Sequence, residues 1–212
     1  MDGPIMVGGG LEPERLIDAY RRGVFPWPVS GGNRGLWWWS PDPRGILDPK
    51  KLHVPRRLRR LIRSSGFTFT IDTAFNRVIR ACATHGTRRG NTWITSPMVR
   101  AYGRLHELGT CHSVEVWRGE RLAGGLYGVS MGGLFAGESM FSRVSNASKA
   151  ALVWLVEGLR ENGCSLVDVQ LPSPHLEQFG VEAVPRREFL ARLADALQRQ
   201  SCWPPSGGLR GE

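Results

Sequence analysis

The chain has 212 residues, 41% of them hydrophobic and 22% charged, and its formal net charge is +9. This is the size of one domain, or of a large domain that carries a small one, and the apolar fraction excludes bulk disorder. The longest apolar run, residues 150–156, is far shorter than the roughly 20 residues of a membrane span. We therefore expect a globular protein with no membrane segment.

The cysteines and the first residues indicate a compartment. Cys82, Cys111, Cys164 and Cys202 are widely spaced without a Cys-x-x-Cys pair, which is typical of reduced thiols rather than of a disulfide framework. Residues 1–10 lack the basic segment and the apolar stretch of a secretory signal. We expect a cytoplasmic protein that acts as a monomer.

The first third of the chain predicts a small lobe. Residues 13–22 predict a short helix with one apolar face. Residues 25–47 are rich in Trp, Pro and Gly, and they predict little regular structure. We assign residues 1–62 to a small, Trp-rich N-terminal lobe that ends in a basic helix.

The rest of the chain alternates between strand and helix periodicity. Helices are predicted over 72–84, 96–108, 145–161 and 185–200, and strands over 67–71, 112–118, 121–129, 133–141 and 165–170. This order predicts an α+β fold, with residues 63–200 forming a larger catalytic domain around a central mixed sheet. Residues 201–212 predict a disordered tail.

Positive charge is concentrated in the predicted basic helix. Seven of the residues 50–63 are Lys or Arg and none is acidic. Because Pro55 favours a helix start, arginines at helical spacing fall on one side, namely Arg56, Arg59, Arg60 and Arg63. A charge run is usually a solvated helix face. The missing acid and the overall charge instead favour a surface for phosphates, as on RNA.

Polar side chains interrupt two apolar strands. Asp168 and Gln170 lie at i and i+2 of the strand over 165–170, so they are expected to share a face. Glu138 lies similarly within the strand over 133–141. Acids are rarely buried unpaired, so the pattern indicates a negatively charged pocket for a cation. The alternative is an Asp168 satisfied by local backbone or by an arginine.

Two tryptophans are candidate stacking platforms. Trp37, Trp38 and Trp39 are interpreted as packing residues, whereas Trp27 and Trp93 lie in predicted loops. Stacking of an unpaired base on an aromatic ring is worth about 1–3 kcal/mol. Spacing alone does not choose between stacking and packing for these two side chains.

Two cofactor classes are weighed and set aside. His106, Cys111 and His112 have ligand side chains, but no second cluster completes a tetrahedral set, so we predict no metal site. Acyl-CoA transferases with this order of elements hold the pyrophosphate on a glycine-rich loop before a helix. The corresponding segment here, residues 142–146, has no glycine, which argues against CoA while leaving acyl transfer open.

The motifs, read together, resemble a known family. They include VGGGLEPERLIDAYRRGVFPW, WWSPDPRGIL, NTWITSPMVRAYGRLHELG, SVEVW, GGLYGVSMGGLFAGESMFSRVSNASKAALVWL, DVQ and PHLEQFGVEAVPRREFL. In this order they are similar to the bacterial leucyl/phenylalanyl-tRNA–protein transferases, from about residue 7 to about residue 198. The chain departs from the family in starting later than most members and in having Leu155 where an aromatic residue is common.

The resemblance implies an activity and a fold. Members of this family transfer Leu, Phe or sometimes Met from aminoacyl-tRNA to proteins whose N-terminal residue is Arg or Lys, which marks those proteins for the N-degron pathway. The larger domain has the scaffold of N-acetyltransferases but uses no CoA. No cofactor and no metal are expected, and the partners are aminoacyl-tRNA and protein.

The resemblance also implies roles for individual residues. Asp168 and Gln170 correspond to the proposed catalytic relay, and Glu138 to a group that binds a substrate ammonium. Trp27 and Trp93 would hold the terminal adenosine. The donor side chain would enter a pocket of Leu126, Phe135, Leu152, Leu155, Leu159 and Val167, and the tRNA phosphates would lie on Arg56, Arg57, Arg59, Arg60 and Arg63.

Two other functions remain open from the sequence. A non-catalytic RNA-binding module would explain the charge and the aromatic residues but not the acids within apolar strands. A CoA-dependent N-acyltransferase would suit the order of elements, although the pyrophosphate loop is missing. Incubation with leucyl-tRNA and an Arg-starting peptide separates these alternatives.

Overall fold

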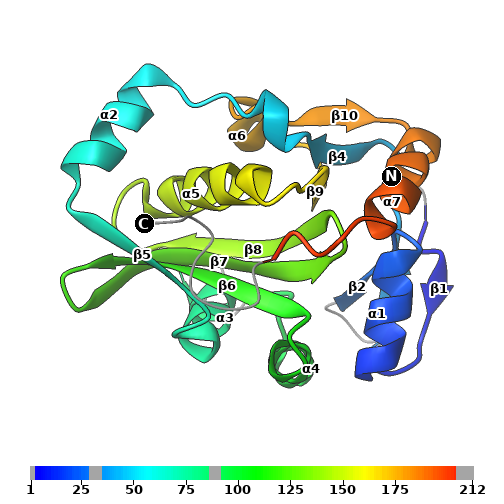
Figure 1. The fold of residues 1–212 in the computed structure, drawn as a ribbon. Coiled ribbons are helices and arrows are strands. Elements are labelled where there is room, and N and C mark those ends of the chain that lie inside the picture. The colour runs from blue at the N-terminus through cyan, green and yellow to red at the C-terminus, as the bar shows by residue number, and fades with distance from the viewer. Residues whose placement is uncertain (1–2, 29–34, 86–91, 204–212) are drawn as a thin grey trace.

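The computed structural model describes residues 3–28, 35–85 and 92–203. They form two sheets, a three-stranded one in the order β1-β3-β2 and a seven-stranded one in the order β10-β4-β9-β8-β7-β6-β5 (Figure 1). Among the described helices, none is long and apolar enough to cross a membrane.

The large sheet is mixed, as the sequence predicts. Its strands are β4 (Arg44–Leu47), β5 (Phe67–Ile71), β6 (Cys111–Arg118), β7 (Arg121–Met131), β8 (Leu134–Ser142), β9 (Leu166–Gln170) and β10 (Glu182–Val184). The pair β8–β9 is parallel, and the other neighbouring pairs are antiparallel. The predicted meander of β6, β7 and β8 is confirmed.

Helices cover both faces of this sheet. α3 (Phe75–Thr84) and α4 (Ser96–Glu107) pack on one face, and α5 (Ala147–Glu161) packs on the other. Successive side chains of β7 point to opposite faces of the sheet. Leu126 belongs to the core under α5, and its neighbour Tyr127 belongs to the core under α3 and α4. The predicted helices and the observed ones agree to within three residues at each end.

The small sheet lies in the Trp-rich segment, where the sequence predicts little regular structure. Its strands are β1 (Met6–Val7), β2 (Phe25–Pro28) and β3 (Leu36–Trp39), and α1 (Pro13–Arg21) contacts β2. β2 is an edge strand with two prolines, which an edge tolerates because its outer side donates no ladder hydrogen bonds. The strands are too short for a periodic signal.

The structure differs from the boundary predicted at residue 62. β4 pairs with β9 on one side and with β10 on the other, so residues 44–47 belong to the large sheet. The basic helix α2 (Arg56–Ser64) places Leu58 in the same apolar core as α5. The small layer therefore ends before β4, and residues 44–62 are part of the larger one.

The C-terminal region also differs in part from its prediction. α6 (Pro174–Glu177) and α7 (Arg186–Leu197) precede a segment whose last described residues, Cys202 and Trp203, are buried. The Trp203 ring stacks on His112 and on Phe135, with centroids 4.2 and 5.8 Å apart. Cys202 and Trp203 are thus packed rather than disordered, and the remainder of the predicted tail, 204–212, lies outside the described residues.

Candidate active site and basic face

A cavity opens where two central strands separate. β8 and β9 pair only from Leu134 and Leu166 to Ala136 and Asp168, and beyond this point they diverge. A cavity of about 230 Å³ lies at the divergence and is closed on other sides by α5, α6 and the aromatic residues of β2. The separation of paired strands thus creates an opening in an otherwise continuous core.

Most of the apolar residues predicted for a donor pocket line this cavity. They are Leu126, Phe135, Leu152, Leu155 and Val167. The prediction for Leu159 is corrected, because this residue is fully buried in the α5 core and is not among the cavity walls. It lies one turn further along α5 than Leu155, away from the opening.

Glu138 supplies a carboxyl group to the cavity wall. The residue is 8% exposed, and its side chain accepts hydrogen bonds from Tyr102 Oη at 3.1 Å and Gln170 Nε2 at 2.9 Å. The Tyr102 hydroxyl is itself 2.5 Å from the hydroxyl of Tyr20 on α1. Glu138 therefore ends a chain of hydroxyl groups that reaches the N-terminal layer.

Burial changes the acidity of Glu138. Loss of hydration, and to a smaller extent the charge of Asp168, raise its pKa, whereas hydrogen bonds from Tyr20, Tyr102 and Gln170 lower it, and the net result is a pKa of about 7. The raised pKa places the change of charge of Glu138 close to neutral pH, where a cavity group can exchange a proton during a reaction.

Asp168 has a different environment from the one predicted. Its two carboxylate oxygens accept from Arg44 Nε at 2.8 Å and from Arg44 Nη2 at 2.6 Å, and one also accepts from the backbone N–H of Gln170 at 2.9 Å. Arg44 is 1% exposed, donates to Gly23 O at 3.1 Å and packs between the rings of Phe25 and Phe189. Asp168 is thus held in a bidentate ion pair.

This geometry corrects the expected shared face of Asp168 and Gln170. Gln170 has φ +62°, so the strand alternation that the prediction assumed is broken there. The Gln170 side chain lines the cavity, whereas Asp168 is 2% exposed and does not. The alternative of an aspartate satisfied by an arginine describes Asp168 better than a free proton acceptor does.

Trp27 and Trp93 meet at the cavity mouth. Both line the cavity, and their rings stack on each other with centroids 4.8 Å apart and an interplanar angle of 14°. Trp27 also walls an adjoining apolar hollow of about 180 Å³, together with Trp39. The two tryptophans predicted as stacking platforms therefore lie together, each with one ring face covered by the other.

Three buried residues of the site were missed by the sequence reasoning. Arg44 lies in a four-residue strand with no periodic signal, 124 residues before Asp168. Tyr20 and Tyr102 lie on the apolar faces of α1 and α4, where an aromatic residue normally indicates packing. Only the buried acids Glu138 and Asp168 signal that such partners must exist.

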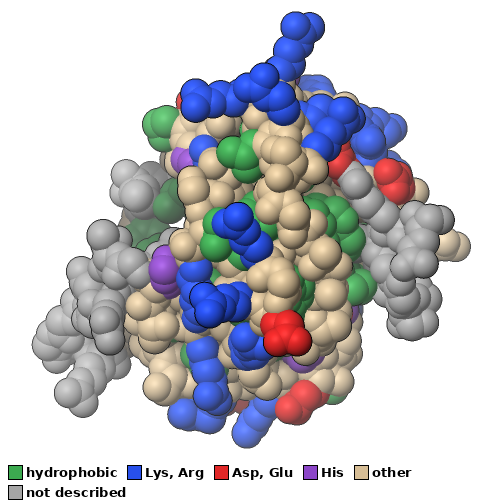
Figure 2. Space-filling model, turned by 90° about the vertical axis from the view of Figure 1, so that its left-hand side faces the viewer, with side chains coloured by type: hydrophobic (Ala, Val, Ile, Leu, Met, Phe, Trp, Pro, Cys, Tyr) green, Lys and Arg blue, Asp and Glu red, His purple; other side chains and the backbone are tan. Residues whose placement is uncertain are grey.

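The arginines of α2 form the walls of a surface groove. Arg56, Arg59, Arg60 and Arg63 line a hollow of about 470 Å³, whereas Arg57, although exposed, does not. Figure 2 shows Lys and Arg side chains at the top of the face that carries α2. One acid does approach this helix, because Arg59 Nη1 lies 3.7 Å from Glu157 of α5.

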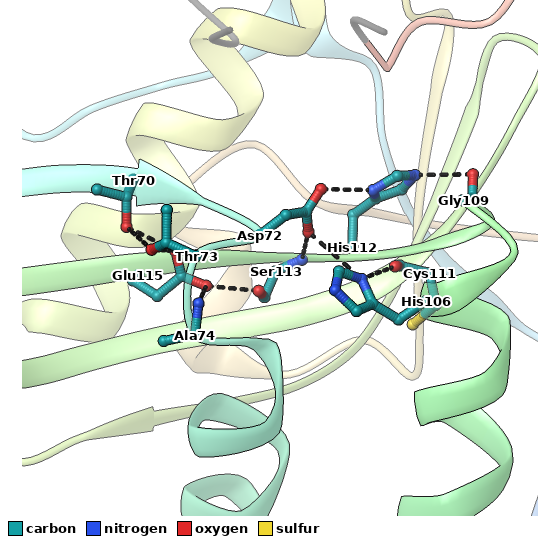
Figure 3. A network of polar contacts seen from close by, with 10 residues as sticks. All are labelled: Thr70, Asp72, Thr73, Ala74, His106, Gly109, Cys111, His112, Ser113 and Glu115. Carbon is teal, nitrogen blue, oxygen red and sulfur yellow. Dashed lines mark hydrogen bonds and ion pairs between the residues drawn. The ribbon is translucent and has the colours of Figure 1, made fainter. Parts of the chain in front are cut away.

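A separate polar cluster brings together two of the histidines that were considered as ligands. His106 and His112 meet Asp72, with ligand atoms within 4.8 Å of one another (Figure 3). Cys111 takes part through its carbonyl oxygen, which is 2.8 Å from His106 Nδ1. The sequence did not identify Asp72 as a member of this cluster.

Hydrogen bonds account for the side chains of this cluster. The two ring nitrogens of His112 face oxygens that only accept, Asp72 Oδ2 at 2.8 Å and Gly109 O at 3.1 Å. Asp72 Oδ1 also accepts from the backbone N–H of Ser113 at 2.8 Å. Because both ring nitrogens of His112 lie within hydrogen-bond distance of oxygens of Asp72 and Gly109, the cluster fits a structural tie between the end of β5 and β6 better than a metal site.

Comparison with known proteins gives consistent results. A family profile described as Leucyl/phenylalanyl-tRNA protein transferase matches residues 46–194, and one described as Leucyl/phenylalanyl-tRNA protein transferase N-terminal domain matches residues 9–42. The N-terminal match ends at residue 42 and the other begins at residue 46, so the break between them falls at the start of β4. β4 is also the first strand in the chain that pairs within the large sheet.

Curated relatives of the same description cover most of the chain. A leucyl/phenylalanyl-tRNA–protein transferase of Anaeromyxobacter sp. (strain K) is 54% identical over 93% of this chain and 84% of its own length. Those of Stutzerimonas stutzeri and Pseudomonas aeruginosa are 52% and 49% identical, over 94% and 98% of this chain and 88% and 89% of their own lengths.

Solved structures are more distant. A GCN5-related N-acetyltransferase from Kribbella flavida has a TM-score of 0.44 at 12% identity, covering 77% of this chain and 57% of its own. A conserved protein of unknown function from Bacteroides thetaiotaomicron has a TM-score of 0.45 at 8% identity, with 76% and 57% covered. From the profile matches and the curated relatives, the chain belongs to the leucyl/phenylalanyl-tRNA–protein transferase family, whose members are aminoacyltransferases.

Proposed function

We propose that this chain transfers Leu or Phe, and less readily Met, from aminoacyl-tRNA to the α-amine of proteins that begin with Arg or Lys. The new peptide bond would mark those proteins for degradation by the N-degron pathway. One observation carries the proposal, namely the apolar cavity that ends at the Glu138 carboxyl group beside Gln170.

The apolar part of the cavity suits a hydrophobic side chain of the donor amino acid. Its walls are aliphatic and aromatic, so a charged side chain would lose its hydration without gaining a partner. An apolar pocket discriminates single methylene groups by only about 1–3 kcal/mol. Selection among Leu, Phe and Met is therefore graded, whereas rejection of charged residues is strong.

Glu138 is placed to bind the ammonium group of the donor amino acid. In an aminoacyl ester this group is bonded to the carbon that carries the side chain, so it lies close to the opening of the side-chain pocket. A charge-assisted hydrogen bond of this kind contributes about 1.5–3 kcal/mol. The pair forms only while Glu138 is charged and the donor amine is protonated, so donor binding strengthens as the pH rises through the pKa of Glu138, about 7, and weakens again above the ordinary pKa of an α-amine, about 7.7–8.0.

The reaction itself requires alignment more than activation. An amine attacks an ester, the ester C–O bond breaks as the C–N bond forms, and one proton of the amine passes to the ribose oxygen, which leaves as a hydroxyl group. The acceptor α-amine has an ordinary pKa of about 7.7–8.0, so a usable fraction is already neutral. Holding the two groups together can contribute about 7–11 kcal/mol.

Gln170 and Asp168 have separate tasks in this scheme. The Gln170 amide lines the cavity, where it can hydrogen-bond the incoming amine. Asp168 acts as a positioning residue, because its carboxylate fixes the Gln170 backbone and is neutralised by Arg44. Both carboxylate oxygens of Asp168 already accept hydrogen bonds from Arg44, and the residue does not line the cavity, so its geometry suits positioning rather than contact with the amine.

The test is a transfer assay with matched acceptors. The full chain is incubated with tRNA charged with labelled Leu and with two peptides that differ only in an N-terminal Arg or Ala. We expect label to accumulate on the Arg peptide alone, without added CoA or nucleotide. Tight tRNA binding with no label on either peptide would favour a non-catalytic RNA-binding module, and a requirement for acyl-CoA would favour an N-acyltransferase.

A further inference from the structure

A second basic groove lies apart from the α2 groove. It has a volume of about 400 Å³, and its walls carry the exposed residues Arg77 of α3, Arg121 of β7 and Arg143 after β8. The β6–β7 hairpin and the loop after β8 lie on the side of the molecule that also carries α2 (Figure 1). Lys and Arg side chains gather at the top of this face and again toward its lower part (Figure 2).

Strand pairing links the two grooves. α2 ends at Ser64, and β5 begins three residues later at Phe67, which pairs with Arg118 of β6. Arg118 in turn pairs with Arg121 across the β6–β7 hairpin, and Arg121 lines the second groove. The end of the basic helix and the second groove are thus neighbours at one end of the sheet.

Two of the three arginines of the second groove are held by aromatic rings, and none of the three is neutralised by a described acid. The Arg77 guanidinium lies 5.0 Å from the centroid of the Trp117 ring, and that of Arg143 lies 5.5 Å from the centroid of the Phe141 ring. A cation–π contact holds a guanidinium through its face and leaves its N–H groups for other partners, and of the nitrogens of Arg143, Nη1 donates to Leu122 O at 3.5 Å. Within the described part of the chain, no carboxylate lies within ion-pair distance of Arg77, Arg121 or Arg143.

We propose that this groove is a second phosphate-binding surface and that it holds the tRNA backbone together with the α2 groove. Guanidinium groups match phosphate oxygens in a bidentate manner. Glu120, also at the groove, limits the positive charge there but is exposed. That the RNA is the donor tRNA rests on the proposed function, whereas the phosphate-binding surface does not.

A membrane surface is a poorer partner for this face. Peripheral membrane binding combines basic residues with apolar side chains that enter the lipid. The large hydrophobic residues that are exposed in the described chain lie in and just before β1, just after α4 and in α7, namely Ile5, Met6, Val7, Leu108 and Leu190. None of these exposed residues lines either arginine groove. The aliphatic residues on the walls of the second groove are Leu122, Ala123 and Val144.

The experiment measures how strongly uncharged tRNA binding by the full chain depends on salt. The double variant Arg121→Gln/Arg143→Gln is compared with wild type and with Arg192→Gln, in which an exposed arginine paired with Glu188 on α7 is lost. Each phosphate contact contributes about 0.9 to the slope of log K against log salt concentration. We expect the double variant to lose about 2 from this slope, and Arg192→Gln to keep the wild-type value.

A second readout separates this surface from the proposed reaction. The double variant should raise the KM for full-length aminoacyl-tRNA about tenfold, while the KM for a short aminoacyl-nucleotide donor changes much less. An unchanged salt slope would overturn the proposal, as would equal competition by polyglutamate and by RNA, which would indicate an acidic protein partner. If the double variant has a lower salt slope but the wild type shows no transfer activity, the phosphate-binding surface would be supported and the proposed function would be refuted.

Discussion

Two buried acids on neighbouring strands have opposite environments. Asp168 of β9 is neutralised by Arg44 and is closed off from the cavity, whereas Glu138 of β8 lines the cavity and has hydroxyl and amide groups as its hydrogen-bond partners among the described residues. The charged partner fixes one acid as part of the scaffold. The uncharged partners leave the other able to gain and lose a proton near neutral pH, since burial raises its pKa to about 7.

The comparison teaches that burial of an acid within an apolar strand does not by itself identify its role. Both residues are less than 10% exposed, and both interrupt apolar sequences in the same way. The partner of the acid determines its role. A guanidinium stabilises the charge of the carboxylate, whereas a hydroxyl group only reduces the free-energy cost of burying that charge. Each of the following changes tests one side of this difference.

Arg44→Met should have the largest effect, on stability. Removing one partner of a buried ion pair leaves the Asp168 charge uncompensated, and this typically costs about 3–5 kcal/mol. Chemical denaturation of the variant should show a loss of this size. The matched double variant Arg44→Met/Asp168→Leu should recover part of it, and a double variant no more stable than the single one would mean that the pair does not act as a scaffold.

Glu138→Gln should have the next largest effect, on the donor. Loss of the carboxylate should raise the donor KM about tenfold or more, as expected for loss of one charge-assisted hydrogen bond. Folding raises the pKa of Glu138. The free energy of unfolding of the wild type should therefore also decrease as the pH rises from the pKa of Glu138 in the unfolded chain toward its folded pKa of about 7. Denaturation of Glu138→Gln should lack this fall, and an identical pH dependence in both proteins would contradict the assignment.

Leu155→Phe should change selection by the cavity. A larger side chain on the cavity wall leaves less room, so transfer of Leu should be favoured over transfer of Phe by up to about tenfold. Competition between leucyl- and phenylalanyl-tRNA measures the ratio. Leu159→Met, a change in the core behind the cavity, serves as the control, and the same shift in both variants would mean that Leu155 acts through packing alone.

Tyr102→Phe should have the smallest effect, a shift in pH dependence. The hydroxyl stabilises the charged form of Glu138, so its loss should raise the pKa of Glu138 above about 7, by up to about one unit. The readout is the pH at which donor binding weakens. Tyr127→Phe removes a buried hydroxyl with no hydrogen-bond partner among the described residues and should leave this pH unchanged.

The sequence predicted the regular part of the fold and missed the short strands. β7 and α5 have long periodic patterns, so their type and position followed from hydrophobic spacing. β4 is four residues long, and its place between β9 and β10 depends on pairing with residues more than 100 positions away. No local pattern encodes such a pairing, and this is why the boundary predicted at residue 62 differs from the strand pairing.

The sequence indicated many residues of the candidate site, but not how they contact one another. The resemblance indicated most of the cavity walls, whereas periodicity alone indicated only that Glu138 and Asp168 need partners. The partner of Asp168 could not be identified, because Arg44 lies in a segment without a periodic signal. The positive φ of Gln170 ends the simple alternation of β9, so the predicted common face of Asp168 and Gln170 failed at that residue.

The most direct test is the donor KM of wild type, Glu138→Gln and Asp168→Asn, measured from below to above the pKa of Glu138, about 7. In the wild type we expect the donor KM to fall as the pH rises through this value, at pH values below the ordinary pKa of an α-amine, about 7.7–8.0, where the donor ammonium is still charged. A fall should persist in Asp168→Asn, displaced to lower pH because the charge of Asp168 raises the pKa of Glu138, and it should be absent in Glu138→Gln. A fall that disappears in Asp168→Asn and persists in Glu138→Gln would contradict the roles given to the two acids.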